Sequence, residues 1–288
     1  MSPSSSTRGR KPLFWLISIC LGAILFLCLR VWARSVSAPS NDMSNLRSIV
    51  QVKLIYANDH NDQLPLGTDI WDDARLLAEA DLNFASIWQS QLDPATTSRN
   101  ELLEVLVPGE QRKNRQLNPA FRQIKPSYAI PLAKLNTKMT SSTPVIWTRG
   151  LQPDGSWSKH SPYGTESGFI TFLGGNTSGY RNLSDDGGQL LRFDGKGKTA
   201  NILEALPPGS KISEYTPTLS EQKKWTRINW QRTTVRKATN LWSISFLFIG
   251  IVYMPLFGSS KYGQKISTRA LVITNVFLAL LAVAISFV

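Results

Sequence analysis

Few residues of this 288-residue chain could do acid–base or metal chemistry, and one small group of them lies close together. Asp59, His60 and Asp62 stand where a helical pattern stops before Pro65. Imidazole and carboxylate groups at this spacing could bind a metal ion or transfer protons. Asn and Asp residues at helix exits also serve as caps and turns. This second interpretation is favoured, because caps and turns are the ordinary role of such residues at a helix exit. The other of the two histidines, His160, is a hundred residues away.

Acidic turns form the second candidate. Asp185 and Asp186 precede two glycines, and Asp194 precedes Gly195. Calcium prefers several oxygen ligands on a flexible loop, whereas Asp–Gly pairs are typical of hairpin turns. The spacing does not match an EF-hand, so turns are favoured and calcium binding stays open. Gly195–Thr199 lacks the first glycine of a phosphate-binding loop. We therefore expect no catalytic, cofactor-binding or metal-binding residue and no enzymatic activity.

Three long apolar runs without any Asp, Glu, Lys or Arg dominate the chain: Leu13–Leu29, Leu241–Phe257 and Ala270–Val288. A helix that crosses a bilayer needs about 20 mostly apolar residues. The runs predict one transmembrane helix within residues 1–34 and a transmembrane hairpin, 241–257 and 270–288, within residues 241–288. An uncleaved anchor is favoured over a signal peptide for the first run, because it is long for a signal peptide.

Both cysteines, Cys20 and Cys28, lie inside the first apolar run. Residues 35–222 therefore contain no disulfide, zinc knuckle or thiol nucleophile. Packing residues are the favoured interpretation of the two cysteines, with lipidation or a crosslink between spans as the alternative.

The positive charge of the chain is concentrated beside the apolar runs. The net charge is +12, yet Ser35–Gln222 holds 18 Lys and Arg against all 20 acids. Six cations lie in Lys223–Lys237, interleaved with Trp225 and Trp230. Cations and tryptophans beside apolar helices are typical of headgroup contact, so we expect residues 223–240 to lie at the lipid interface and expect no nucleic-acid binding. A helix that binds a partner protein is the alternative.

Residues 35–222 have the pattern of one α+β domain. A helix is predicted from Asn41 or Asp42 to Asn58, because Leu46, Ile49, Val50, Leu54 and Ala57 form one apolar stripe. Trp71–Gln91 predicts one or two further helices, and Glu101–Val107 continues the helical character. Glu110–Lys125 is basic and aperiodic, which favours a surface loop.

Short β-type runs separated by turn residues follow the helices. They are Ser127–Ile130, Pro144–Thr148, Gly168–Leu173 and Gln189–Phe193. Helices first and strands later indicate an antiparallel sheet with helices on one face. We expect the stripe that begins at Leu46 to cover that face.

Two groups of segments resemble a known family over about Asp42–Leu206. The first group is Asn45–Ile49, Tyr56–Asp62 and Leu64–Pro65, and the second is Thr143–Gly150, Asp154–Trp157 and Gly168–Asn176. In this order they resemble type IV pilin-like (type II secretion) pseudopilins of the Verrucomicrobia, Lentisphaerae and Planctomycetes type. The resemblance implies an N-terminal helix anchored in the bacterial inner membrane and packed on an antiparallel sheet in the periplasm.

The chain also departs from that family. Members that enter a filament carry a glycine and then an apolar stretch with glutamate at the fifth mature position, for cleavage by a prepilin peptidase and for assembly. Leu13–Leu29 holds no acid, and the two C-terminal runs are foreign to a pilus subunit. We expect a multi-pass inner-membrane scaffold that presents a periplasmic domain to envelope or secretion-related proteins. A membrane-bound ligand sensor or an accessory subunit of a transport complex is the alternative.

Overall fold

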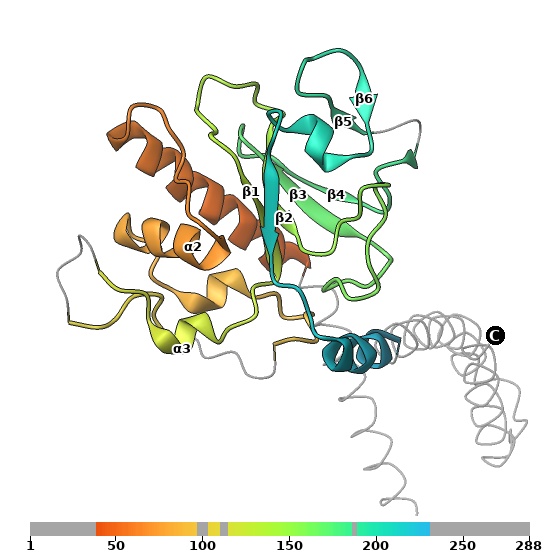
Figure 1. Ribbon diagram of the computed structural model, residues 1–288, viewed down its shortest axis with the longest axis horizontal. Helices are drawn as coiled ribbons and strands as arrows, with labels where there is room; N and C mark the ends of the chain where they lie inside the picture. The colour runs from red at the N-terminus through yellow and green to blue at the C-terminus, as the bar shows by residue number, and fades with distance from the viewer. Residues whose placement is uncertain (1–38, 97–102, 110–114, 186–188, 231–288) are drawn as a thin grey trace, which may run out of the picture. The chain divides into compact units, whose positions relative to one another are not determined.

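Helices precede most of the strands in the part of the chain that the computed structural model describes, residues 39–96, 103–109, 115–185 and 189–230 (Figure 1). These residues belong almost entirely to one unit, Ala38–Asn229. The three apolar runs of the predicted transmembrane helices lie outside the described residues. Within the described ranges, no helix combines the length and the apolar character that crossing a membrane requires.

The first helix occupies residues 39–59 and confirms the predicted apolar stripe. Leu46, Ile49, Val50 and Ala57 are buried, whereas Ile55 on the opposite side is 54% exposed. The helix ends because the next residues turn: Asn61 and Asp62 take the left-handed conformation, with φ of 54° and 64°.

Five antiparallel strands form the main sheet in the order β4-β3-β2-β1-β7. Their bounds are β1 Tyr128–Leu132, β2 Pro144–Thr148, β3 Gly168–Phe172, β4 Thr177–Tyr180 and β7 Lys211–Glu214. The last strand returns to pair with the first, with Ile130 opposite Ser213. The sequence predicted β1, β2 and β3 but neither edge strand, β4 or β7.

A separate two-stranded sheet consists of β5 Leu190–Leu191 and β6 Lys198–Thr199. The predicted strand Gln189–Phe193 is therefore a short piece of a hairpin and lies outside the main sheet. The short 3-10 helix η3, Ile202–Ala205, packs beside this hairpin, and Phe193 N donates to Glu204 O at 2.8 Å.

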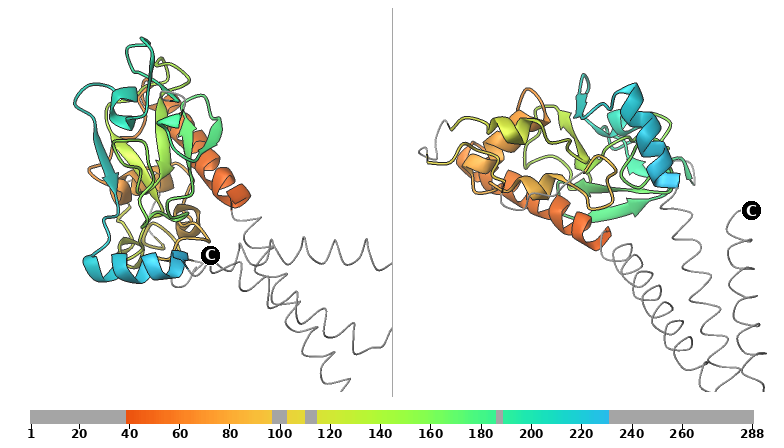
Figure 2. Two further views of the ribbon diagram at one scale, coloured as in Figure 1. Left: turned by 90° about the vertical axis from the view of Figure 1, so that its right-hand side faces the viewer. Right: turned by 90° about the horizontal axis from the view of Figure 1, so that it is seen from below.

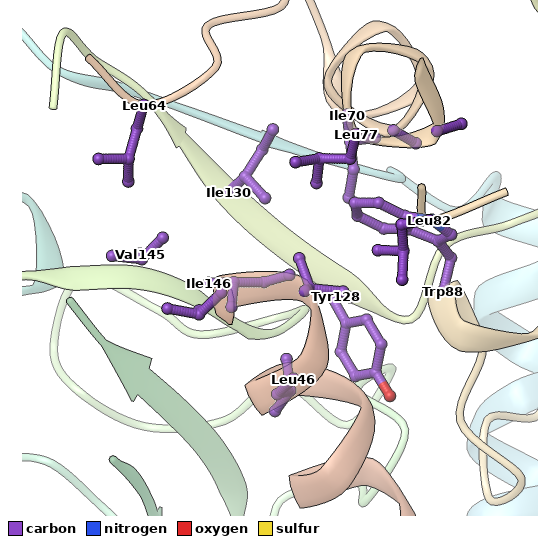
Figure 3. Packing of buried hydrophobic residues seen from close by; sticks show 14 of the residues in the cluster. Leu46, Leu64, Ile70, Leu77, Leu82, Trp88, Tyr128, Ile130, Val145 and Ile146 are labelled. Carbon is purple, nitrogen blue, oxygen red and sulfur yellow. The ribbon is translucent and has the colours of Figure 1, made fainter. Parts of the chain in front are cut away.

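Each face of the main sheet packs against its own hydrophobic cluster. On one face Tyr128, Ile130 and Ile146 pack against the first helix and the helices that follow it (Figure 3). On the other face Ala129, Trp147, Ile170 and Phe172 pack with residues of the β5–β6–η3 region such as Leu190 and Ile202. The alternation of strand side chains between two faces explains the division. The predicted α+β arrangement, with the Leu46 stripe on the sheet, is confirmed.

The region predicted as one or two helices forms two short ones. Helix α2 spans Ile70–Glu79, and the 3-10 helix η1 spans Ala85–Trp88. The Asp69 side chain caps α2 by accepting from Asp72 N. A buried ion pair between Lys53 of the first helix and Asp73 of α2 joins the two helices.

Two predictions between the helices and the sheet are wrong. Residues 103–107 are extended, with bridges from Phe84 to Glu104 and from Leu106 to Leu117. A short apolar run satisfies helix and strand patterns equally. In the structure this run is extended, and Leu106 within it is buried. The expected surface loop Glu110–Lys125 contains helix α3, Pro119–Arg122, whose Phe121 is fully buried. Asn118 caps α3, with proline at the first helical position.

The last described helix occupies residues 219–230. Figure 2 shows that its side of the unit is also the side where the first helix begins, while β5 and β6 lie at the far end. Both ends of the unit Ala38–Asn229 therefore lie away from the small hairpin.

Candidate functional site

The Asp59–His60–Asp62 group forms local contacts at the end of the first helix. The His60 ring stacks on Tyr56 with centroids 3.6 Å apart, and its Nδ1 lies 2.7 Å from Tyr56 O. Asp62 forms an ion pair with exposed Lys138 at 3.1 Å. No group of three His, Cys, Asp or Glu side chains that could hold a metal occurs in the described ranges. These residues form a turn, as the favoured interpretation predicts.

The acidic turns near β5 and β6 do not form a metal site in the part of the chain that the structure describes. Asp194 Oδ1 accepts from Lys196 N at 2.9 Å, which is a turn contact within the β5–β6 hairpin. Asp185 is exposed, and Asp186 lies outside the described residues. Calcium binding at Asp185, Asp186 and Asp194 stays an untested alternative to the favoured turns.

A buried ion pair that the sequence did not predict lies at the start of β1 and the end of β2. Arg149 and Asp93 are 1% and 0% exposed, and Arg149 Nη2 is 2.7 Å from Asp93 Oδ1. Arg149 also donates to the carbonyls of Pro126 at 3.0 Å and His160 at 3.3 Å. Asp93 Oδ2 accepts from Ser127 Oγ at 2.6 Å. Charges this far from water persist only when they are paired and hydrogen-bonded.

The last helix covers this ion pair with Trp225. The Arg149 guanidinium carbon lies 4.8 Å from the centre of the Trp225 ring, and Trp225 is 2% exposed. Lys125 Nζ is 5.7 Å from the rings of both Trp225 and Tyr215. Glu221 forms an ion pair with Lys125 and accepts from the Tyr215 hydroxyl at 2.9 Å. Cation–aromatic contacts of this kind contribute about 0.5–2 kcal/mol each, so they fasten the helix to the unit.

That residues 223–240 lie at the lipid interface stays a prediction, and within this segment Trp225 is buried in the unit. Its indole ring is turned inward, because Arg149 gains a π face there and the ring is removed from water.

Asp42, in the first turns of helix 39–59, is the second carboxyl of this region and has a different environment. It is 1% exposed and accepts a hydrogen bond from the Tyr163 hydroxyl. Burial raises the pKa of Asp42 from 3.8 to about 6. The hydrogen bond from Tyr163 and the nearby polar side chains of Ser90 and Tyr128 oppose this shift, and the charge of Asp93 adds to it. Asp93 has Arg149 as its counter-ion, whereas the groups that bond to Asp42 are neutral.

We call the residues Asp42, Asp93, Tyr128, Arg149, Tyr163 and Trp225 the buried polar cluster. It connects the first helix, the segment after η1, the sheet and the last helix. Its side chains are enclosed, so its chemistry is that of a charge-paired support and of one carboxyl able to bind a proton near pH 6.

Weak sequence signals marked part of this cluster. Arg149 directly follows the five buried residues of β2, an unusual place for a charge. Asp42 stood out only as a helix cap. Asp93 carried no signal, because its partner is 56 residues away in sequence.

Comparison of the chain with protein-family models, with curated proteins and with solved structures gave no match.

The burial of Asp42 predicts how the Asp42→Asn variant behaves with pH. The pKa of Asp42 is raised on folding, so its contribution to stability is complete below about pH 3.8 and is lost as pH rises to about 6. The loss is about 3 kcal/mol, since one pKa unit is about 1.4 kcal/mol. We therefore expect the free energy of unfolding of Asp42→Asn, relative to wild type, to increase by about this amount between pH 4 and pH 7.5.

Urea unfolding of the full chain in detergent, followed by tryptophan fluorescence at each pH, measures this difference. Asp194→Asn removes the same charge from an exposed turn and serves as the control for net charge. Burial also raises the pKa of Glu214, but Glu214 is present in all three proteins, so its contribution cancels in the difference. A difference between Asp42→Asn and wild type that does not change with pH would contradict the assignment.

The ion pair predicts a large effect of Arg149→Met. The substitution leaves Asp93 charged and buried, so we expect a loss of about 3–5 kcal/mol in the free energy of unfolding. Adding Asp93→Asn should recover part of that loss, because the stranded charge is removed. The matched control is Arg192→Met, whose partner Glu204 is 3.2 Å away with both side chains more than 40% exposed. It should cost at most about 1 kcal/mol. Equal losses for Arg149→Met and Arg192→Met in urea unfolding would refute the role of the buried pair.

Proposed function

We propose that this protein is a non-enzymatic, membrane-anchored scaffold that presents its α+β unit to other proteins of the bacterial envelope. In this proposal the inner membrane holds the predicted helices of residues 13–29, 241–257 and 270–288. The unit Ala38–Asn229 faces the periplasm.

The observation that carries the proposal is that both ends of the unit lie on one side and are held there by the buried polar cluster (Figure 2). Asp42 holds the start of the first helix through Tyr163, and Trp225 holds the last helix through Arg149. In the sequence, the first apolar run ends at Leu29, shortly before the first helix, and the second begins at Leu241, shortly after the last helix. A unit whose two exits share one side suits attachment to a single membrane surface.

The pseudopilin-like resemblance is a further part of the proposal. A long first helix on an antiparallel sheet supports it, because that is the arrangement the resemblance implies. The missing glutamate in Leu13–Leu29 and the two C-terminal runs favour a permanently anchored relative over a fibre subunit.

An interaction role is supported by an apolar patch on the β5–β6–η3 region. Leu191, Phe193 and Leu203, which we call the tip patch, are 38–39% exposed. The backbone bond from Phe193 N to Glu204 O places their segments side by side. Grouped exposed apolar side chains are typical of protein-binding surfaces. The buried polar cluster, in contrast, is too enclosed to touch a substrate.

A sensor is the second candidate function, and Asp42 favours it. A carboxyl with a pKa of about 6 beside the start of the first helix could convert a pH change into a change at the membrane side of the unit. The scaffold remains preferred. A sensor needs an element that moves between two states when Asp42 changes its charge, and the contacts of Asp42 described above include no such element.

The location of the unit can be tested by labelling single cysteines with a membrane-impermeant maleimide. Starting from Cys20→Ser/Cys28→Ser, we expect Lys196→Cys, in the exposed β5–β6 turn, to react in intact cells with a permeabilised outer membrane. Ser6→Cys, in the N-terminal tail, should react only after lysis. Labelling of Ser6→Cys and protection of Lys196→Cys in intact cells would reverse the orientation.

The interaction role can be tested by photo-crosslinking in living cells. A photoreactive amino acid at Phe193, in the tip patch, should give discrete adducts with envelope proteins. The control position is Ile55, which is also exposed but lies on the first helix. Identical adducts at both positions, or none at Phe193, would argue against the tip patch as a binding surface.

A further inference from the structure

The last helix has two unlike faces, and only one of them is used by the unit. Trp225 is buried and Glu221 is bonded to Lys125, so these residues point inward. Leu219, Lys223, Lys224 and Arg227 are exposed, and Leu219 is 76% exposed. Because residues three or four positions apart share a helix face, these four residues form one stripe. We call them the outer face of the last helix.

The outer face has an unbalanced positive charge. Glu221 is the one acid in the sequence of residues 219–230, and it is occupied on the inner side. Its carboxylate accepts from Lys125, from the Tyr215 hydroxyl and from Thr218 N. Three cations and an exposed leucine thus remain on a surface without an acid of the same helix. This composition is typical of helices that lie in a membrane interface.

The sequence beyond the helix limits how far this face can be from a bilayer. Arg232, Arg236 and Lys237 follow, and the second apolar run begins at Leu241. The eleven steps from Trp230 to Leu241 span at most about 40 Å even when fully extended. If residues 241–257 cross the membrane, the outer face is tethered close to the headgroups.

We propose that the outer face of the last helix binds the headgroups of anionic lipids and so holds the unit in one orientation on the membrane surface. The inference rests on the proposed membrane anchoring. The inference extends that proposal by giving each side of the helix its own contact. Trp225 packs against the unit, and Lys223, Lys224 and Arg227 bind the lipid. Charge complementarity selects the lipid, since anionic phosphates are the headgroup feature that ammonium and guanidinium groups recognise.

The inner contacts make such binding orienting as well as attractive. The Trp225 ring is held by Arg149, which directly follows β2, and by Lys125, which lies between α3 and β1. A helix fastened in this way cannot rotate without breaking those contacts. Headgroup binding by the outer face would therefore align the whole unit. The β5–β6 hairpin, at the end of the unit far from the last helix (Figure 2), would then be directed away from the bilayer.

The experiment uses the full chain with Cys20→Ser and Cys28→Ser, reconstituted in lipid nanodiscs that carry nitroxide-labelled lipid. A fluorophore on Ser220→Cys reports on the outer face, and one on Lys196→Cys reports on the far hairpin. Nanodiscs of phosphatidylcholine are compared with nanodiscs containing phosphatidylglycerol. We expect lipid-borne quenching at position 220 that requires phosphatidylglycerol. It should be lost near 1 M salt, where the Debye length is about 3 Å, and position 196 should stay unquenched.

Charge variants distinguish lipid binding by the outer face from a general attraction of the positively charged protein to anionic lipid. Lys223→Gln/Lys224→Gln/Arg227→Gln should reduce quenching at position 220 to the phosphatidylcholine level. Lys198→Gln/Lys211→Gln/Arg192→Gln removes three exposed cations elsewhere and should leave it unchanged. Equal quenching in both lipids, or no loss in the outer-face triple variant, would overturn the inference while the chain remains in the disc. A chain that does not enter the discs at all would instead overturn the proposed anchoring and the inference that rests on it.

Discussion

The arrangement of the unit depends on keeping the Arg149–Asp93 pair out of water. A buried arginine needs acceptors for its fork of donors, and for Nη1 and Nη2 of Arg149 these are Asp93 and the carbonyls of Pro126 and His160. These groups come from three separate segments, so the ion pair fixes the segment after η1, the entry to β1 and the loop after β2 relative to one another. Trp225 then covers the guanidinium and fixes the last helix as well.

Asp42 and Asp93 show how neighbouring carboxyls acquire different properties from their surroundings. Asp93 forms an ion pair with Arg149 and accepts a hydrogen bond from Ser127. Asp42 is as deeply buried, but it is hydrogen-bonded by the neutral Tyr163 hydroxyl, and burial raises its pKa to about 6. The same region of the fold thus combines a buried ion pair with a carboxyl whose pKa is raised to about 6. Both lie near the ends through which the chain leaves the unit.

The parts of the fold that were predictable have strong apolar periodicity. The Leu46 stripe and the runs of β1, β2 and β3 can be recognised in the sequence. Burying one face imposes a period of 3.6 residues on a helix and of 2 residues on a strand. The edge strands β4 and β7, with sequences Thr-Ser-Gly-Tyr and Lys-Ile-Ser-Glu, lack such a pattern and form because the neighbouring strand offers them hydrogen bonds. The pairing of Arg149 with Asp93 was not predictable, since it follows from the packing of distant segments.

The position of the last helix argues for an anchor over a fibre subunit. A subunit that leaves the bilayer needs a single membrane helix that can be withdrawn, and the rest of its surface must be free to pack against copies. Here Lys125, Arg149 and Tyr215 hold the Trp225 side of residues 219–230, directly before the sequence that leads to Leu241. If the C-terminal runs cross the membrane, as proposed, withdrawal of the unit would require extracting them with it, because they are covalently joined to the last helix. The contacts of the Trp225 side make the helix a firm support, because they transfer any force on the chain beyond residue 230 to the sheet.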